Sequence, residues 1–329
     1  MRPFVYERAN SPQTAVAAFE QEHATAFLAG GTTLIDLMKL DVMRPQRVID
    51  INGLGADDIT LTKDHLRLGA SVHMADAEMH AELRGRVPML TQSLALAAST
   101  QIRHMATLGG NVLQRTRCPY FRDVTWQACN KRSPGSGCAA LNGFNRQHAI
   151  LGTSDACIAT YPGDFAQALI ALDATVDILG SDGRRRISFS ELHARPGRTP
   201  DIETTLAPDD LILGFEMPVE PWMRRSLYLK IRDRESYEFA LASAAVALDI
   251  AEGAIRQARI ALGGVATVPW RAREAEQALI GRAPDEAACQ LAADIAFSDA
   301  RPQQHNAFKP MLGRQTIVRA LMQATAMEA

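Results

Sequence analysis

The sequence predicts an α+β protein with two domains, and three observations carry this prediction. Its 329 residues suffice for about two domains of roughly 100 to 200 residues, and 47% of them are hydrophobic, so each domain can bury its own core. Apolar runs typical of strands alternate with periodic segments typical of helices, without an internal repeat. The pattern changes after a strand that ends at Pro218, so we expect domains at residues 1–218 and 219–329.

The opening of the chain is expected to form a small αβαβ subdomain at residues 1–52. Ser11 followed by Pro12 is typical of a helix start, because serine caps the first turn and proline fits inside it. A short apolar strand at 25–29, a helix at 34–40 and a second strand at 47–51 follow.

A second subdomain is expected at residues 53–218. Strands at 59–61 and 66–68 pair as a hairpin, and helices at 74–83 and 89–99 precede a glycine break at 107–111. Residues 114–160, here called the cysteine-rich segment, have little periodicity. We expect an ordered insertion that is stabilised by interactions other than the burial of an apolar face. A helix at 164–173 and strands at 174–179 and 211–217 complete the subdomain.

The C-terminal domain is expected to place its strands before its helices. Strand-like runs at 227–232, 240–248 and 256–262 are followed by helical patterns near 271–279, 286–296 and 308–326. This order predicts a compact α+β domain.

Charge and hydropathy exclude several classes of partner. The chain has 35 Lys and Arg against 37 Asp and Glu, which favours neither nucleic acid nor an anionic membrane surface. No run approaches the ~20 apolar residues of a membrane span, and the start MRPFVYERAN lacks the apolar core of a secretory signal, so we expect folding in the cytoplasm. The basic run at 184–186 follows Ser181-Asp182-Gly183 and is expected at an exposed hairpin turn.

Two glycine pairs are candidates for holding a dinucleotide. Ala29-Gly30-Gly31-Thr32-Thr33 follows a predicted strand, and without Cβ atoms its backbone N–H groups can converge on a pyrophosphate; a plain tight turn uses the same residues. The second pair lies in Thr107-Leu108-Gly109-Gly110-Asn111. Gly53-Leu54-Gly55 starts like a nicotinamide-binding fingerprint but has Asp58 at the third glycine position, which would repel a pyrophosphate.

The cysteines are the most specific feature of the chain. Cys118, Cys129, Cys138 and Cys157 have the spacing C-x10-C-x8-C-x18-C, and the expected compartment disfavours disulfides. Four thiolates suit a [4Fe–4S] cluster or tetrahedral zinc, and unligated thiols are the third possibility. The wide spacing without a close CxxC pair favours the iron–sulfur cluster, and neighbouring Arg and Lys residues and Gly135 and Gly137 could serve it. Cys289 is expected to be a buried small hydrophobe.

Together these segments resemble the FAD-binding medium subunits of the xanthine oxidase class of molybdenum hydroxylases, which include the carbon monoxide dehydrogenase flavoproteins. The resemblance runs through both glycine loops, Tyr161-Pro162-Gly163-Asp164 and the stretch ALGGVATVPW at 261–270. The stretches RTRCPYF, ACNKRSPGSGCAALNGFNRQHAILG and ACIAT are similar to the flavin subunits of periplasmic aldehyde oxidoreductases of the PaoABC type, where the corresponding cysteines hold a [4Fe–4S] cluster.

The resemblance implies a fold and a set of site residues. The fold is a two-subdomain FAD-binding fold of the vanillyl-alcohol oxidase or PCMH-like type, with a C-terminal α/β domain of the carbon monoxide dehydrogenase flavoprotein type. The implied FAD contacts are Ala26, Phe27, Leu28, Ala29, Gly30, Gly31, Thr32, Thr33, Leu34, Thr107, Gly109, Asn111, Asp164, Ile212 and Lys230. The implied cluster ligands are Cys118, Cys129, Cys138 and Cys157.

The resemblance also implies partners and a reaction. A large molybdopterin subunit would convert an aldehyde and water to a carboxylic acid, and a small subunit with two [2Fe–2S] clusters would relay single electrons. This subunit, in a heterotrimer, would collect them on FAD for an external acceptor, without catalytic residues of its own. A partner with a twin-arginine signal would carry the folded complex to the periplasm, the cytoplasm being the alternative.

Two other functions are weighed against this one. The first is a zinc-stabilised binding or assembly protein without turnover, and the second is a stand-alone flavin reductase that uses NADH. The absence of a nicotinamide fingerprint disfavours the reductase.

Overall fold

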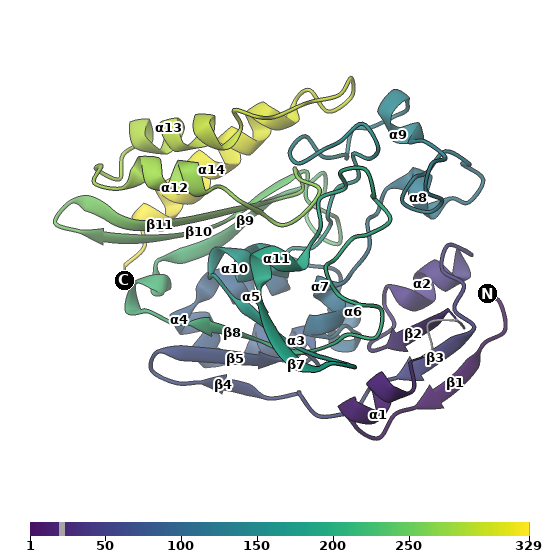
Figure 1. The fold of residues 1–329 in the computed structure, drawn as a ribbon. Coiled ribbons are helices and arrows are strands. Elements are labelled where there is room, and N and C mark those ends of the chain that lie inside the picture. The colour runs from purple at the N-terminus through teal and green to yellow at the C-terminus, as the bar shows by residue number, and fades with distance from the viewer. Residues whose placement is uncertain (20–23, 329) are drawn as a thin grey trace.

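In the computed structural model, residues 1–19 and 24–328 are described, and they form three sheets in consecutive stretches of the chain (Figure 1). The first is the parallel sheet β1-β3-β2, built from β1 (Val5–Arg8), β2 (Thr25–Leu28) and β3 (Arg47–Asp50). Helices α1 (Pro12–Ala17) and α2 (Leu34–Lys39) connect these strands. Ser11 and Thr14 form a capping box at α1, as expected from Ser11-Pro12.

The second sheet is antiparallel, with the order β4-β5-β8-β6-β7. Its strands are β4 (Ile59–Leu61), β5 (His65–Gly69), β6 (Thr175–Gly180), β7 (Gly183–Ser188) and β8 (Leu211–Pro218). The helices of this part are α3 (Met74–Met79), α4 (Ala81–Arg86), α5 (Pro88–Ala95), α6 (Thr100–Met105), α7 (Leu108–Val112), α10 (Phe165–Ala171) and α11 (Phe189–Leu192). Phe165, Phe189 and Phe215 meet edge-on in the core between sheet and helices.

Several local expectations for this part were wrong. The helix expected at 89–99 ends at Ala95, and a separate helix, α6, begins at Thr100 with Ser99 as its cap. The helix expected at 74–83 is broken at His80, whose backbone is extended and whose side chain caps α4. The glycine break expected at 107–111 is a short helix, α7, because the Thr107 hydroxyl accepts from the Gly110 N–H and caps its first turn.

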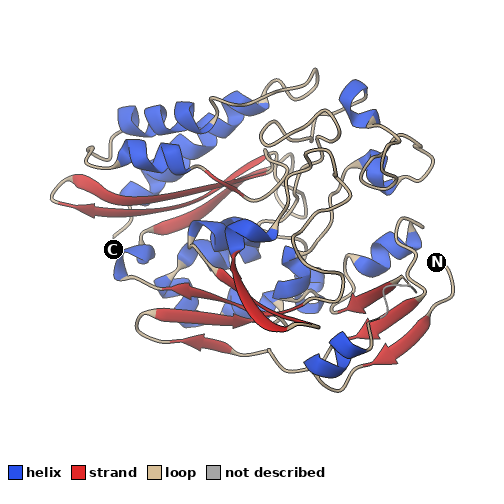
Figure 2. Cartoon of the chain, in the orientation of Figure 1, coloured by secondary structure: helices blue, strands red, loops and turns tan. Residues whose placement is uncertain are grey.

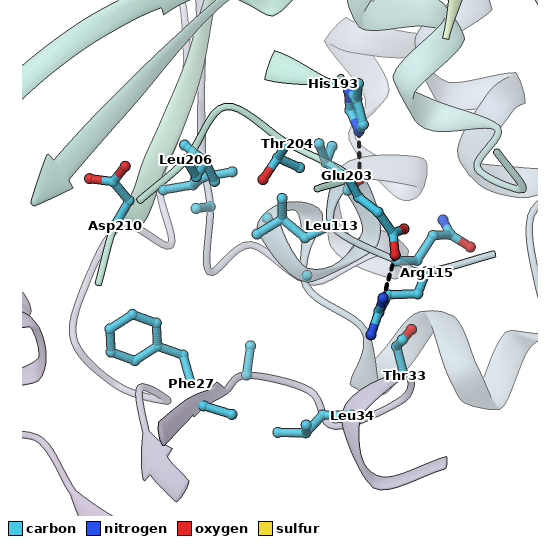
Figure 3. A pocket seen from close by; sticks show the side chains of 18 of the residues that line it. Phe27, Thr33, Leu34, Leu113, Arg115, His193, Glu203, Thr204, Leu206 and Asp210 are labelled. Carbon is cyan, nitrogen blue, oxygen red and sulfur yellow. Dashed lines mark hydrogen bonds and ion pairs between the residues drawn. The ribbon is translucent and has the colours of Figure 1, made fainter. Parts of the chain in front are cut away.

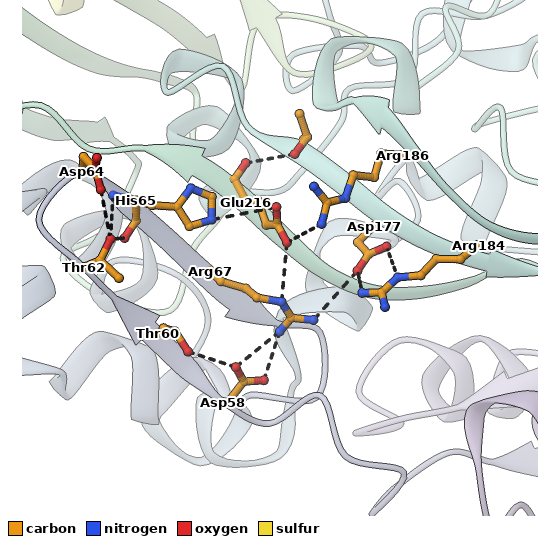
Figure 4. A network of polar contacts seen from close by, with 11 residues as sticks. Asp58, Thr60, Thr62, Asp64, His65, Arg67, Asp177, Arg184, Arg186 and Glu216 are labelled. Atoms are coloured by element: carbon orange, nitrogen blue, oxygen red, sulfur yellow. Dashed lines mark hydrogen bonds and ion pairs between the residues drawn. The ribbon is translucent and has the colours of Figure 1, made fainter.

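The arginine run at 184–186 lies on β7, beyond the hairpin turn expected to carry it. Figure 4 shows the resulting network around Arg67, which lies near Asp58, Asp177 and Glu216. Arg184 pairs with the buried Asp177, and Arg186 pairs with Glu216 at 2.8 Å. The basic run therefore neutralises carboxylates of its own sheet.

The third sheet belongs to the C-terminal domain and has the order β12-β11-β10-β9. A short 3-10 turn, η2 (Pro221–Arg224), leads into β9 (Ser226–Ile231), β10 (Ala242–Ala251), β11 (Ala254–Gly263) and β12 (Trp270–Arg271). Helices α12 (Arg273–Leu279), α13 (Glu286–Ala296) and α14 (Lys309–Thr325) pack together on it, and Cys289 is buried there as expected. The α+β class and the strands-before-helices order are confirmed.

Figure 2 shows that the cysteine-rich segment is mostly loop. It contains only two short helices among its described residues, α8 (Pro119–Arg122) and α9 (Ala139–Asn142). Across residues 1–19 and 24–328, none of the helices is both long and apolar enough to cross a membrane.

Candidate functional site

A cavity of about 620 Å³ lies where the first two sheets and the cysteine-rich segment meet (Figure 3). The turn after β2, the start of α7 and the segment 193–213 contribute to its wall. The predicted FAD contacts that line it are Ala26, Phe27, Ala29, Gly30, Gly31, Thr32, Thr33, Leu34, Thr107, Gly109 and Ile212. The fold thus brings the two predicted glycine loops to one cavity.

The glycines let the two loops approach each other. A Cβ on Gly30 would lie 1.8 Å from the carbonyl oxygen of Met105, at the end of α6. Gly31 has a φ of +71°, a backbone conformation that favours glycine. A Cβ on Gly109 would lie 3.0 Å from the Cβ of Ala70. Larger residues would therefore push the walls of the cavity apart.

Charged residues at the cavity come from segments far apart in the sequence. The Arg115 guanidinium donates to the Glu203 carboxylate at 2.7 Å (Figure 3). Lys131 lies 3.6 Å from the same carboxylate. Asp210 accepts from Arg185 at 2.7 Å. Sequence reasoning did not single out Glu203 or Asp210, because no local motif marks a partner that lies 88 or 25 residues away.

His193 is a further lining residue that the sequence analysis missed. Its Nε2 atom lies 3.1 Å from the carbonyl oxygen of Val112, and its ring meets Tyr161 edge-on. Burial lowers the pKa of His193 to about 4, so the ring is neutral near pH 7. A neutral imidazole adds no charge to this wall.

Four predicted FAD contacts do not line the cavity: Leu28, Asn111, Asp164 and Lys230. Leu28 lies on β2, and its carbonyl accepts from the Ile51 N–H. The Lys230 ammonium lies 2.7 Å from the Asp164 carboxylate, and both side chains are buried. For Asp164 and Lys230 a direct FAD contact stays a prediction, because the structure pairs their charges with each other.

The residues around the cavity fit a dinucleotide such as FAD. Backbone without Cβ atoms gives close approach for phosphates, and Arg115 and Lys131 supply positive charge. Phe27 and Leu206 supply apolar surface for ring systems. On α7, the side-chain oxygen of Asn111 is buried without a hydrogen-bond partner, but it lies outside the lining of the cavity.

The four clustered cysteines lie near one another in the fold, and all are free thiols. Cys129 and Cys138 face each other across an isolated bridge, and the thiol of Cys118 interacts electrostatically with those of Cys129 and Cys157. Burial, with a smaller contribution from neighbouring thiols, raises the pKa of Cys118 to about 12 and that of Cys157 to about 11. Within the described ranges, no group of three His, Cys, Asp or Glu side chains is placed to hold a single metal ion.

Most basic neighbours of the cysteines have other partners than expected. Arg117 and Arg122 both bind Asp36 on α2, and Arg146 binds Asp233. The guanidinium of Arg132 donates to carbonyl groups in its own segment, including that of Tyr120 at 2.8 Å. The N–H of Gly137, expected to be free for sulfur, donates to the side chain of Asn130. Lys131 partly offsets the rise that burial causes in the pKa of Cys157, and both residues line the large cavity.

Comparison with known proteins identifies the class. Residues 2–220 match the model of the FAD binding domain in molybdopterin dehydrogenase, and residues 227–324 match that of the CO dehydrogenase flavoprotein C-terminal domain. The chain therefore belongs to the FAD-binding medium subunits of the molybdenum hydroxylase family, and it is an oxidoreductase subunit.

Individual relatives narrow the comparison. The chain is 44% identical to the aldehyde oxidoreductase FAD-binding subunit PaoB of Escherichia coli (strain K12), over 99% of each chain. It is 25% identical to the glyceraldehyde dehydrogenase medium chain of Sulfolobus acidocaldarius, over 92% of this chain and 90% of the relative. A chain of the carbon monoxide dehydrogenase from Hydrogenophaga pseudoflava superposes with a TM-score of 0.76 at 25% identity, over 99% and 98% of the two chains. The predicted family and fold are confirmed.

Proposed function

We propose that this chain is the electron-transfer subunit of a molybdenum-dependent aldehyde oxidoreductase. A large molybdopterin subunit converts the aldehyde and water to a carboxylic acid, a small subunit with two [2Fe–2S] clusters relays the electrons, and this chain delivers them through FAD to an external acceptor. Two full-length relatives named for oxidation of aldehydes support the substrate class.

The residues of this chain bind and orient the flavin. FAD, when bound, supplies the step between single-electron donors and a two-electron acceptor. The first glycine loop can present its backbone N–H groups to the pyrophosphate, because Gly30 lets the loop pack against the Met105 carbonyl and Gly31 adopts the left-handed conformation of the turn. Arg115 and Lys131, held by Glu203, place positive charge on the wall. The neutral ring of His193 closes part of that wall without competing for phosphate.

We further propose that Cys118, Cys129, Cys138 and Cys157 hold a [4Fe–4S] cluster. In such a cluster each thiolate binds a different iron, so the sulfurs need only converge on a common volume. Zinc instead requires sulfurs about 4 Å apart around one ion, since each Zn–S bond is about 2.3 Å. The electrostatic interactions of Cys118 with Cys129 and Cys157, and of Cys157 with Cys138, support one site that all four cysteines share.

The observation that carries the proposal is the position of Cys157. This residue is a candidate cluster ligand, and it also lines the cavity that fits FAD. The two redox groups would therefore be neighbours in one subunit, as electron transfer between them requires. Lys131, beside Cys157 and on the same cavity wall, would offset negative charge on both groups.

Chemical analysis of anaerobically purified protein tests the proposal. We expect one FAD, four iron and four sulfide per chain, with the iron lost in Cys129→Ser. Cys289→Ser is the matched control, because Cys289 is also buried but lies on α13 in the C-terminal domain. Zinc in place of iron would refute the cluster assignment, and absence of flavin would refute the flavoprotein function. Rapid bleaching of the flavin by NADH without partner subunits would favour a stand-alone reductase.

We also propose that the chain works in the periplasm, in a heterotrimer exported on a partner's twin-arginine signal. Folded export is required, since cofactors are inserted before translocation. Cell fractionation tests this proposal: replacing the twin-arginine pair of the partner should leave this chain in the cytoplasm, and an unchanged periplasmic pool would contradict it.

A further inference from the structure

The imidazole of His148 lies directly beside a candidate cluster ligand. Its Nε2 atom is 3.2 Å from the sulfur of Cys118, a residue 30 positions away in the sequence, and the ring is buried. The backbone N–H of Phe121 donates to the carbonyl oxygen of Cys118 at 3.1 Å, which fixes the turn that carries this sulfur. The imidazole of His148 is therefore placed to donate to a negatively charged sulfur on Cys118.

The surroundings of the ring decide which nitrogen carries the hydrogen once the sulfur binds iron. Nδ1 of His148 is buried without a hydrogen-bond partner, so the contact to sulfur is the polar contact that the ring makes. An iron-bound thiolate has no hydrogen and can only accept. A hydrogen on Nε2 therefore gives an N–H···S bond, whereas a hydrogen on Nδ1 would set two lone pairs against each other.

The C-terminal domain fixes the backbone that carries this ring. The His148 N–H donates to the carbonyl of Asn145 at 3.0 Å, and the side chain of Asn306 donates to the His148 carbonyl at 3.2 Å. The ammonium of Lys309, at the start of α14, donates to the Gln147 carbonyl at 3.1 Å.

The side chains of Asn306 and Lys309 are fully buried, and burying such groups is costly unless their hydrogen bonds are made. Here those bonds hold residues 145–148 in place. Such preorganisation is typical of groups that support a metal ligand.

We propose that His148 is a positioning residue that acts through Cys118: it donates an N–H···S hydrogen bond to the iron-bound thiolate and raises the reduction potential of the cluster. The inference rests on the proposed function, because it requires a cluster on Cys118. Reduction adds negative charge to the cluster and its sulfurs, so a donor to the sulfur stabilises the reduced state more than the oxidised state.

The test is a redox titration of the cluster, followed by electron paramagnetic resonance, in the anaerobically purified full chain. His148→Phe removes the donor and keeps a ring of similar size, so we expect a lower midpoint potential with unchanged iron and sulfide. His148→Gln restores an N–H donor and should return the potential toward that of the wild type. Asn306→Leu, which releases the backbone of His148, should shift the potential in the same direction as His148→Phe.

Tyr120→Phe is the matched control. The Tyr120 ring neighbours that of His148, but its hydroxyl donates to the carbonyl of Phe144 and not to sulfur. This variant should keep the wild-type potential. In the wild type, an exchangeable hydrogen coupled to the cluster should be detected by hyperfine spectroscopy after transfer to D₂O, and His148→Phe should lose it.

The outcomes separate the inference from the function on which it rests. An intact cluster whose potential and exchangeable hydrogen are unchanged in His148→Phe overturns the inference alone. Loss of iron from both His148→Phe and His148→Gln also overturns it, because His148 would then be a ligand or a structural residue. Wild-type protein without iron overturns the proposed cluster, and the role of His148 with it.

Discussion

Replacing Gly30 by alanine should separate the two walls of the flavin cavity. The added Cβ would lie 1.8 Å from the Met105 carbonyl oxygen, whereas real contacts of this kind do not fall below 3.0 Å, so the backbones must move apart by about 1.2 Å (3.0 − 1.8). Such overpacking costs about 1–3 kcal/mol. Because Thr107 caps α7 only two residues after Met105, the displacement reaches both glycine loops.

Binding of FAD to the flavin-free protein, measured by quenching of flavin fluorescence, gives the magnitude. A cost of about 1–3 kcal/mol corresponds to a Kd for FAD roughly 5-fold to 150-fold higher in Gly30→Ala. Gly85→Ala is the matched control, since Gly85 is exposed on α4 and a Cβ there meets no atom within 4 Å. If Gly30→Ala bound FAD within twofold of Gly85→Ala, the reasoning about the close approach would be wrong.

Three further results are expected. Glu203→Gln removes the charge that holds Arg115, which should weaken FAD binding by about 1 kcal/mol. FAD release, followed by fluorescence, should then be roughly fivefold faster, and an unchanged release rate would count against this role of Glu203. Asp177→Ala should lower the free energy of unfolding by about 2 kcal/mol in urea, whereas Arg186→Ala, at an exposed pair, should cost under ~0.5 kcal/mol; equal losses would contradict the difference in burial. Burial lowers the pKa of Lys309 from 10.5 to about 7. Between pH 7 and 9 its amine is therefore protonated in the unfolded chain but mostly neutral in the folded protein. The free energy of unfolding of the wild type, relative to Lys309→Met, should therefore rise by about 1.4 kcal/mol per pH unit, and a flat difference would refute the shift.

Local signals in the sequence explain what could be predicted. The glycine loops were found because close backbone approach requires a residue without a Cβ, which is visible at Gly30 itself. Strand β1 was missed, because Val5–Arg8 is mostly exposed and shows no buried alternation.

The polar half of the cavity could not be found in the same way. Glu203 and Asp210 acquire their partners only when distant segments fold together. For Lys230, the local structure was predicted but its partner was not. Its position on a strand follows from the sequence pattern, whereas its buried pairing with Asp164 depends on the packing of two domains.

The contacts of the cysteine-rich segment have a consequence for protein engineering. The segment contacts all three sheet units. It forms ion pairs with Asp36 in the first unit, Glu203 in the second and Asp233 in the C-terminal domain, and it accepts a hydrogen bond from Lys309. Trimming it to a short loop would leave these groups without their partners and would open the wall at Lys131. A minimal flavin module cut from this scaffold would therefore need new partners for each of these anchor points before it could close around its cofactor.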